Sequence, residues 1–165
     1  MKRLMKLIFV AVLLLATFSI KAQVQTTTAG ANIVAPLTLT ETSDMHFGTL
    51  SVNNNPGTVV LTPGNVRTST GGVSLSSATP THRVAAYSVT GQGTLSYVIT
   101  LPTSVTIQQG PNSMVVNNFT TNKPGNIGTL SAGVDAFNVG ATLQVSASQA
   151  TGEYSGNFNI VVAYN

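Results

Sequence analysis

The stretch Thr94-Leu95-Ser96-Tyr97-Val98-Ile99-Thr100-Leu101 decides the fold class, because apolar side chains recur at every second position along it. The residues between them are mostly serine or threonine. A β-strand places successive side chains on opposite faces, so this period of two predicts a strand with one buried face. The same alternation runs through residues 142–148 and, most clearly, through residues 154–165.

Turn signals separate these alternating runs. Clusters of Gly, Pro and Asn reverse the chain, because glycine adopts positive φ and proline pre-sets a turn. Short strands at this spacing predict an all-β fold, an antiparallel immunoglobulin-like β-sandwich without long amphipathic helices. The turn clusters lie at 53–57, 62–65, 91–93, 109–112 and 122–126, and the expected strands are 31–40, 46–52, 57–62, 66–76, 83–90, 94–101, 104–109, 113–119, 135–147 and 153–164.

The amino terminus has the pattern of a secretory signal peptide. Basic residues within 1–6 precede an apolar run from Leu7 to Ile20. This run is shorter than the ~20 apolar residues that a transmembrane helix needs. We therefore expect cleavage after Ala22, a single domain over residues 23–165, and no membrane span in the mature protein. The expected location is extracytoplasmic, which means secreted, at the cell surface or in the periplasm.

The charge of the chain changes sign once this leader is removed. The full sequence has 7 Lys and Arg against 4 Asp and Glu. Four of the basic residues (Lys2, Arg3, Lys6 and Lys21) belong to the leader, so the mature chain has a formal charge of 3 − 4 = −1. The high isoelectric point therefore reflects targeting, and we expect no nucleic-acid binding by the folded domain.

The mature chain offers little reactive chemistry. It has no cysteine, which excludes disulfides, thiol nucleophiles and thiolate metal sites. Glu41, Asp44 and His46 could supply part of a metal site, but zinc needs three or four ligands and no further ligand has a recognisable spacing. Residues 152–156 place a serine one position too late for a nucleophile elbow. We expect no enzyme, and no catalytic, cofactor-binding or metal-binding residues.

The first expected strand is a candidate assembly edge. Ile33, Ala35, Leu37 and Leu39 alternate on one face, with Pro36 among them. Proline has no N–H group to donate, so this strand belongs at a sheet edge or changes sheets there. Such an edge could bind a second copy or another surface protein through main-chain hydrogen bonds. The alternative is an ordinary edge strand whose proline blocks aggregation.

Six segments along the chain carry a family likeness: ANIVAPLT (31–38), HFGTL (46–50), TGGV (70–73), YVITLP (97–102), VNNF (116–119) and the ending from GATL (140–143) to residue 165. Together they resemble a family of small secreted bacterial proteins, domain of unknown function 4402. That family has no assigned activity, so the resemblance implies no catalytic or binding residue. The tail at 152–164 also resembles the last strand of spore-coat-U-like and pilus subunit domains, which are immunoglobulin-like sandwiches. Some of those domains polymerise by donating an amino-terminal strand, although this chain lacks their cysteines.

These features favour an exported, non-enzymatic structural or surface-interaction protein, similar to a fimbrial subunit. The alternative is a monomeric module that binds a glycan or another ligand through Ser, Thr and Asn side chains of its turns. Such a module would display solvent-facing aromatic side chains, whereas most of the aromatic residues fall on the apolar faces of their strands. The eight aromatic residues after the leader are Phe47, Tyr87, Tyr97, Phe119, Phe137, Tyr154, Phe158 and Tyr164.

Overall fold

The structure, a computed structural model, describes residues 21–165. The expected signal peptide falls on residues 1–22, of which 1–20 lie outside the described residues. Residues 21–33 contain no helix or strand, and their side chains are exposed. A compact unit covers Val34–Asn165.

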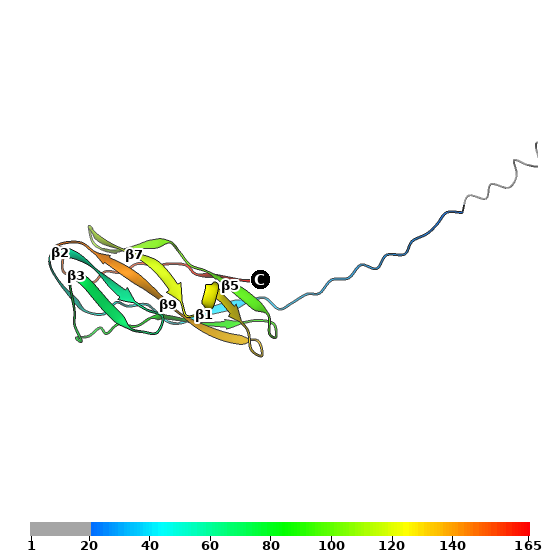
Figure 1. Ribbon diagram of the computed structural model, residues 1–165, viewed down its shortest axis with the longest axis horizontal. Helices are drawn as coiled ribbons and strands as arrows, with labels where there is room; N and C mark the ends of the chain where they lie inside the picture. The colour runs from blue at the N-terminus through cyan, green and yellow to red at the C-terminus, as the bar shows by residue number, and fades with distance from the viewer. Residues whose placement is uncertain (1–20) are drawn as a thin grey trace, which may run out of the picture. The chain divides into compact units, whose positions relative to one another are not determined.

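Ten strands build the compact unit (Figure 1). One short 3₁₀ helix, η1 (Pro124–Asn126), is the only helix in the described part of the chain. Within that part, no helix has the length and apolar character that a membrane span requires. The strands are β1 (Thr38–Ser43), β2 (Leu50–Leu61), β3 (Arg67–Leu75), β4 (Ala85–Thr90), β5 (Ser96–Thr100), β6 (Ser104–Gln109), β7 (Asn112–Thr121), β8 (Ile127–Thr129), β9 (Val134–Val145) and β10 (Val161–Tyr164).

The strands form two sheets in which every strand pair is antiparallel. The larger sheet has the order β1-β4-β9-β2-β3, and β7 also pairs with β9 and in turn with β6. The smaller sheet has the order β10-β5-β8. The expected all-β architecture with antiparallel sheets is therefore confirmed, whereas its immunoglobulin-like detail stays a prediction.

Strand β9 connects the two halves of the larger sheet. Its residues 134–139 pair with β4, and its residues 141–145 pair with β2. Every residue from Phe137 to Val145 is buried except Asn138 and Gln144, so both faces of this part of β9 are covered. β9 therefore runs through the middle of the domain (Figure 1).

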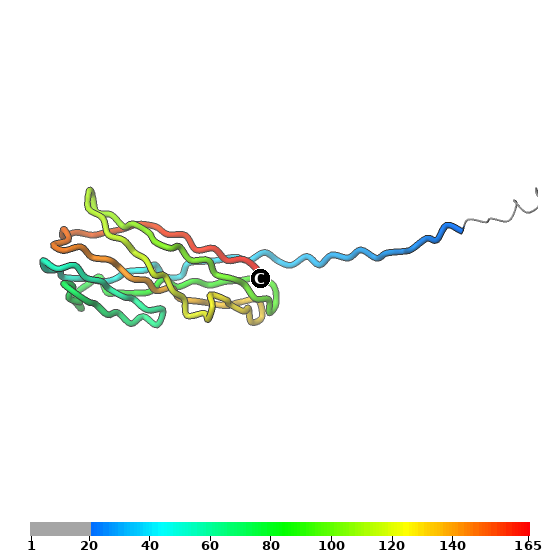
Figure 2. Tube along the Cα trace, turned by 45° about the horizontal axis from the view of Figure 1, so that its top comes forward, coloured from blue at the N-terminus to red at the C-terminus, as the bar shows by residue number. Residues whose placement is uncertain are grey.

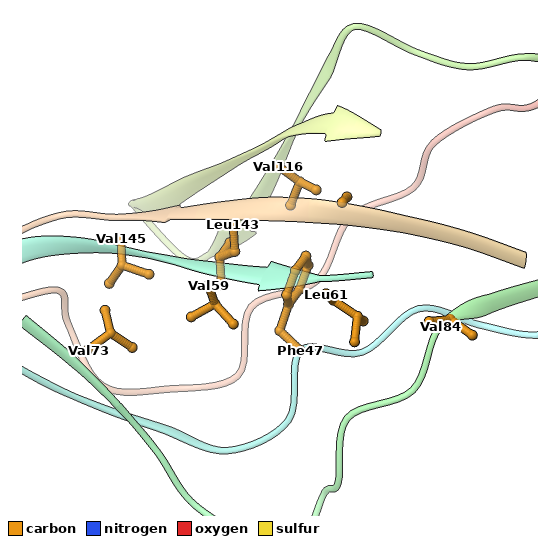
Figure 3. Close-up of a cluster of buried hydrophobic side chains, with 9 residues drawn as sticks. Phe47, Val59, Leu61, Val73, Val84, Val116, Leu143 and Val145 are labelled. Atoms are coloured by element: carbon orange, nitrogen blue, oxygen red, sulfur yellow. The ribbon is translucent and has the colours of Figure 1, made fainter. Parts of the chain in front are cut away.

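Two apolar clusters form the core. The first contains Tyr87 of β4, Phe137 of β9 and Tyr97 of β5, so it lies between the two sheets. The second lies on the inner face of β2, β7 and β9, where Phe47 packs over side chains such as Val59 and Leu143 (Figure 3). Burial of such side chains contributes roughly 25 cal/mol per Å² of apolar surface, and no disulfide assists it.

The first strand begins later than the sequence predicts. Residues 31–37 are not part of a strand, and β1 begins at Thr38. Pro36 cannot donate a ladder hydrogen bond, which is consistent with pairing that starts after it. The Ile33 side chain is 94% exposed, whereas Leu37 packs against the first core cluster.

The Asn53–Gly57 cluster is not a turn between two strands. Strands expected at 46–52 and 57–62 are replaced by the continuous strand β2, which carries a bulge there. Val52 pairs with Val73 and Gly57 with Gly71, so residues 53–56 face only Gly72. Asn53 Oδ1 accepts a hydrogen bond from the Asn55 N–H at 2.9 Å, which stabilises the extra residues locally.

The final strand is shorter than expected, although its alternation is confirmed. β10 covers Val161–Tyr164, and Ser155 forms an isolated bridge with Gln108. Between them, residues 156–160 belong to no strand. The side chains of Phe158, Ile160, Val162 and Tyr164 are nevertheless half-buried, while the residues between them are exposed.

Candidate functional site

One half of the larger sheet has no second sheet opposite it. The inner face of β2, β7 and the second half of β9 is covered by two irregular segments, residues 44–49 and 149–160. Figure 2 shows the second of these segments as an extended trace along the domain, in orange to red. A cleft of about 1090 Å³, lined by both segments, opens over this part of the sheet.

The floor of the cleft is apolar. Strand β6 contributes Val105 and Ile107, β7 contributes Val116, and β9 contributes Leu143 and Val145. The alternation of each strand directs these residues inward, because Thr106, Val115 and Gln144 occupy the opposite face. Since Val105 and Ile107 are only partly buried, the cleft leaves apolar surface accessible.

The charged side chains that line the cleft lie at its rim. Arg83 donates hydrogen bonds from Nε and Nη2 to the two carboxylate oxygens of Asp44, at 2.6 and 2.5 Å. The hydrogen bond from Arg83 lowers the pKa of Asp44. Both side chains are largely solvent-exposed, at 43% and 62%, so the pair contributes at most about 1 kcal/mol. Glu41 and Glu153 also line the cleft.

His46 fixes the course of the segment on one side of the cleft. Its backbone exchanges two hydrogen bonds with Arg83, at 2.8 and 2.9 Å. Its ring Nδ1 accepts a hydrogen bond from the Gly48 N–H at 2.7 Å, so Nδ1 is unprotonated and the neutral ring carries its proton on Nε2. Burial lowers the pKa of His46, and the nearby Arg83 charge lowers it further. The neutral ring is therefore the form that stabilises this turn.

The segment on the other side presents unpaired backbone. Ser155 exchanges two backbone hydrogen bonds with Gln108, at 2.8 and 3.1 Å, and pairing with β5 resumes at Val161. Among the described residues, 157–160 form no backbone hydrogen bond. An extended segment with free N–H and C=O groups is a template for pairing with another strand.

The predicted assembly residues do not gather at this cleft. Ile33 and Ala35 are exposed and lie outside any strand, whereas Leu37 and Leu39 are partly buried against the first core cluster. The Ala35 carbonyl accepts a hydrogen bond from the Tyr164 hydroxyl at 2.8 Å. The four residues therefore divide into an exposed pair and an anchored pair.

The other candidate residues from the sequence line the cleft or pack in the two core clusters. Glu41, Asp44 and His46 all line the cleft, but residues 21–165 contain no group of three acidic or histidine side chains placed to hold a metal ion. None of the eight aromatic residues is exposed. Four of them, Phe47, Tyr87, Tyr154 and Phe158, line the cleft.

A partly buried ionic cluster lies away from the cleft and was not predicted from the sequence. Lys123 Nζ binds Asp135 Oδ1 at 2.7 Å, and the Tyr97 hydroxyl donates to Asp135 Oδ2 at 2.9 Å. The backbone N–H of Ala136 donates to Oδ1 at 2.8 Å. Burial raises the pKa of Asp135, but the hydrogen bonds from these three partners outweigh it and the pKa is lowered. The side chains of Tyr97, Lys123 and Asp135 are separated in the sequence, so no local motif indicates that they meet.

The sequence profile of the family described as Domain of unknown function (DUF4402) matches residues 37–164. The chain belongs to the DUF4402 family. No curated protein and no solved structure matches it. The DUF4402 match begins at Leu37, which packs into the core, and leaves the exposed residues 21–36 outside it. The likeness to spore-coat-U-like and pilus subunits stays a prediction.

Proposed function

We propose that this DUF4402 protein is an exported, non-catalytic structural or surface-interaction protein that assembles like a fimbrial subunit. Its copies associate through main-chain pairing at the cleft. The observation that carries the proposal is the unpaired backbone of residues 157–160 beside an accessible apolar floor. Export rests on the leader pattern of residues 1–22.

The cleft has the properties of a β-augmentation site. In this mode, main-chain hydrogen bonds supply affinity and pockets for alternate side chains supply specificity. The segment at 157–160 offers main-chain groups for hydrogen bonding. The inward side chains of Val105, Ile107 and Val116 offer an apolar surface for the side chains of the added strand. The half of the sheet that lacks a second sheet would gain one more strand by this association.

The occupant is residues 30–36 of a second copy. Ile33 and Val34 are exposed in the structure, at 94% and 37%, although both are strongly apolar. The sequence from Ala22 to Thr40 contains no charged residue, so its burial desolvates no charge. A seven-residue strand spans about 23 Å, with Ala31, Ile33 and Ala35 on one face.

The assembly state of mature residues 23–165 tests the proposal. Light scattering after gel filtration and electrophoresis without boiling should show a ladder of oligomers. Ile33→Asp should abolish the ladder, because a carboxylate would have to be buried in the apolar floor. Val66→Asp is the matched control, since Val66 is a 58% exposed loop residue away from the cleft. A strictly monomeric wild-type protein, or a ladder unchanged by Ile33→Asp, would refute the proposal.

The ligand-binding alternative is favoured by one observation. The volume of the cleft, about 1090 Å³, and its apolar floor with a polar rim are typical of small-molecule sites. A monomeric module predicts thermal stabilisation by a ligand from a glycan or lipid panel, with Ile33→Asp behaving as the wild type. Testing the same ligand panel on the oligomeric protein distinguishes ligand binding from assembly.

A further inference from the structure

Arg67 carries a positive charge that no carboxylate balances. Its Nη1 donates to the carbonyl oxygens of Phe47 at 2.6 Å and Thr49 at 3.4 Å, and its Nη2 donates to that of Ser76 at 2.7 Å. All three acceptors are neutral. The carboxylate partners of the described ion pairs, Asp44 and Asp135, are bound to Arg83 and Lys123. The Arg67 side chain is half-buried, and among residues 21–165 it forms no ion pair.

One donor of this guanidinium is unused. Arg67 Nε is buried and has no hydrogen-bond partner in the structure. Leaving a buried donor unsatisfied is costly, and more so when the donor is charged. Nε is closed to solvent, so an anion from outside the chain would balance the charge of Arg67 without contacting this atom.

A separate cavity lies beside Arg67. It has a volume of about 280 Å³ and shares no lining residue with the large cleft. Ser77 and Thr81 are exposed, so the cavity is reached from solvent. His82 Nε2 is hydrogen-bonded to the Asn65 carbonyl at 3.2 Å, which requires its proton on Nε2 and leaves Nδ1 without an assigned partner. The lining residues are Arg67, Leu75, Ser76, Ser77, Thr81 and His82.

We propose that this cavity binds an oxyanion group, a carboxylate or a sulfate. Arg67 supplies the positive charge, and the hydroxyls of Ser77 and Thr81 supply further donors. The size of the cavity suits one such group rather than a whole drug-sized ligand. The walls carry no carboxylate that would repel the anion.

The site is tested by titration of the mature protein at constant ionic strength. Sodium sulfate and sodium glucuronate are the probes, sodium chloride and glucose are the blanks, and amide chemical shifts are the readout. We expect saturable shifts at residues 75–82 with sulfate and glucuronate but not with either blank. Glucuronate binding without sulfate binding would assign a carboxylate site, and the reverse would assign a sulfate site.

Variants separate binding from folding. Arg67 binds three backbone carbonyls, so it is first left in place while Thr81→Val and Ser77→Ala remove the hydroxyl donors of the lining. Each should weaken binding by at least about fivefold, because each removes a hydrogen-bonding group of the site. Thr120→Val, on the exposed side of β7, is the control and should bind as the wild type.

Arg67→Lys keeps the charge but removes the forked donors, and it should abolish saturation while the unfolding midpoint shows whether the protein is folded. The absence of saturable shifts in the wild type would overturn the proposal. Affinities unchanged by Thr81→Val and Ser77→Ala together would overturn it as well, since binding would then lie elsewhere. The results with Thr81→Val and Ser77→Ala do not bear on assembly, because neither residue lines the large cleft.

Discussion

The Tyr164 hydroxyl donates a hydrogen bond to the Ala35 carbonyl at 2.8 Å and accepts one from the Gln92 N–H at 2.7 Å. These bonds connect Tyr164 of the last strand, β10, to Ala35, which lies near the start of the compact unit. They fix the boundary between the exposed Ile33 and the packed Leu37.

Tyr164→Phe should therefore release this boundary. Loss of the hydroxyl leaves two backbone groups without their partner, and we expect a cost of about 1 kcal/mol because both groups can reach water. Limited proteolysis should show faster cleavage within residues 30–37. Tyr154→Phe is the control, since it loses a hydroxyl bond to Ala150 and leaves this boundary unchanged. Equal cleavage rates in the two variants would contradict the assignment.

The Asp135 cluster should make stability depend on acid. The folded-state pKa of Asp135 is lowered from its usual 3.8, so its contribution is present above that value and is lost as the pH falls from it toward the folded pKa. Asp135→Asn removes the charge that Lys123 and Tyr97 bind, and it should cost about 2 kcal/mol at pH 7. Urea unfolding at pH 7 and at pH 3 measures both effects. A difference between the proteins that is the same at both values would contradict the linkage.

His46 should add a second, milder pH dependence. Its pKa is lowered in the folded protein, so its contribution is complete above the usual value of 6.5 and is lost as the pH falls below it. Protonation removes the lone pair that accepts the Gly48 hydrogen bond. His46→Asn offers an oxygen acceptor that does not titrate at these values. The variant should therefore show a flatter stability profile below pH 6.5, and an unchanged profile would exclude this origin.

Gly128 should tolerate no side chain. A Cβ at this position of β8 would overlap the ring of Tyr97, which is fully buried. Since neither the strand nor a core tyrosine can easily move, Gly128→Ala should destabilise the protein by about 1–3 kcal/mol. Gly64→Ala is the matched control, because the nearest atom to its Cβ is 3.8 Å away. Its effect should stay within about 0.5 kcal/mol.

The sequence predicted the strands whose alternation is uninterrupted. β5, β6 and β9 lie within two residues of the predicted ranges, because inward apolar side chains and outward hydroxyls determine their faces. Local turn signals were less informative. Residues 53–57 carry strong turn chemistry, but the pairing of β2 with β3 continues past them as a bulge. Long-range pairing therefore outweighed a local preference.

The candidate site was harder to predict, because it depends on where the second sheet ends. In the described part of the chain, the half of the larger sheet around β2 and β7 is covered only by irregular segments. Nothing in residues 153–164 distinguishes the paired Val161 from the unpaired Asn157, because both lie in one alternating run. The apolar floor was foreseeable from the pattern of β6 and β7. The gap above it depends on where residues 44–49 turn, which is set by the His46–Gly48 contact and the reach of Arg67.

Because β9 pairs with β4 along one half and with β2 along the other, it contributes Phe137 to one core cluster and Leu143 to the second. Neither cluster can lose this strand without exposing the other. The domain should consequently melt in a single cooperative transition, and its slowest-exchanging amide protons should lie along β9.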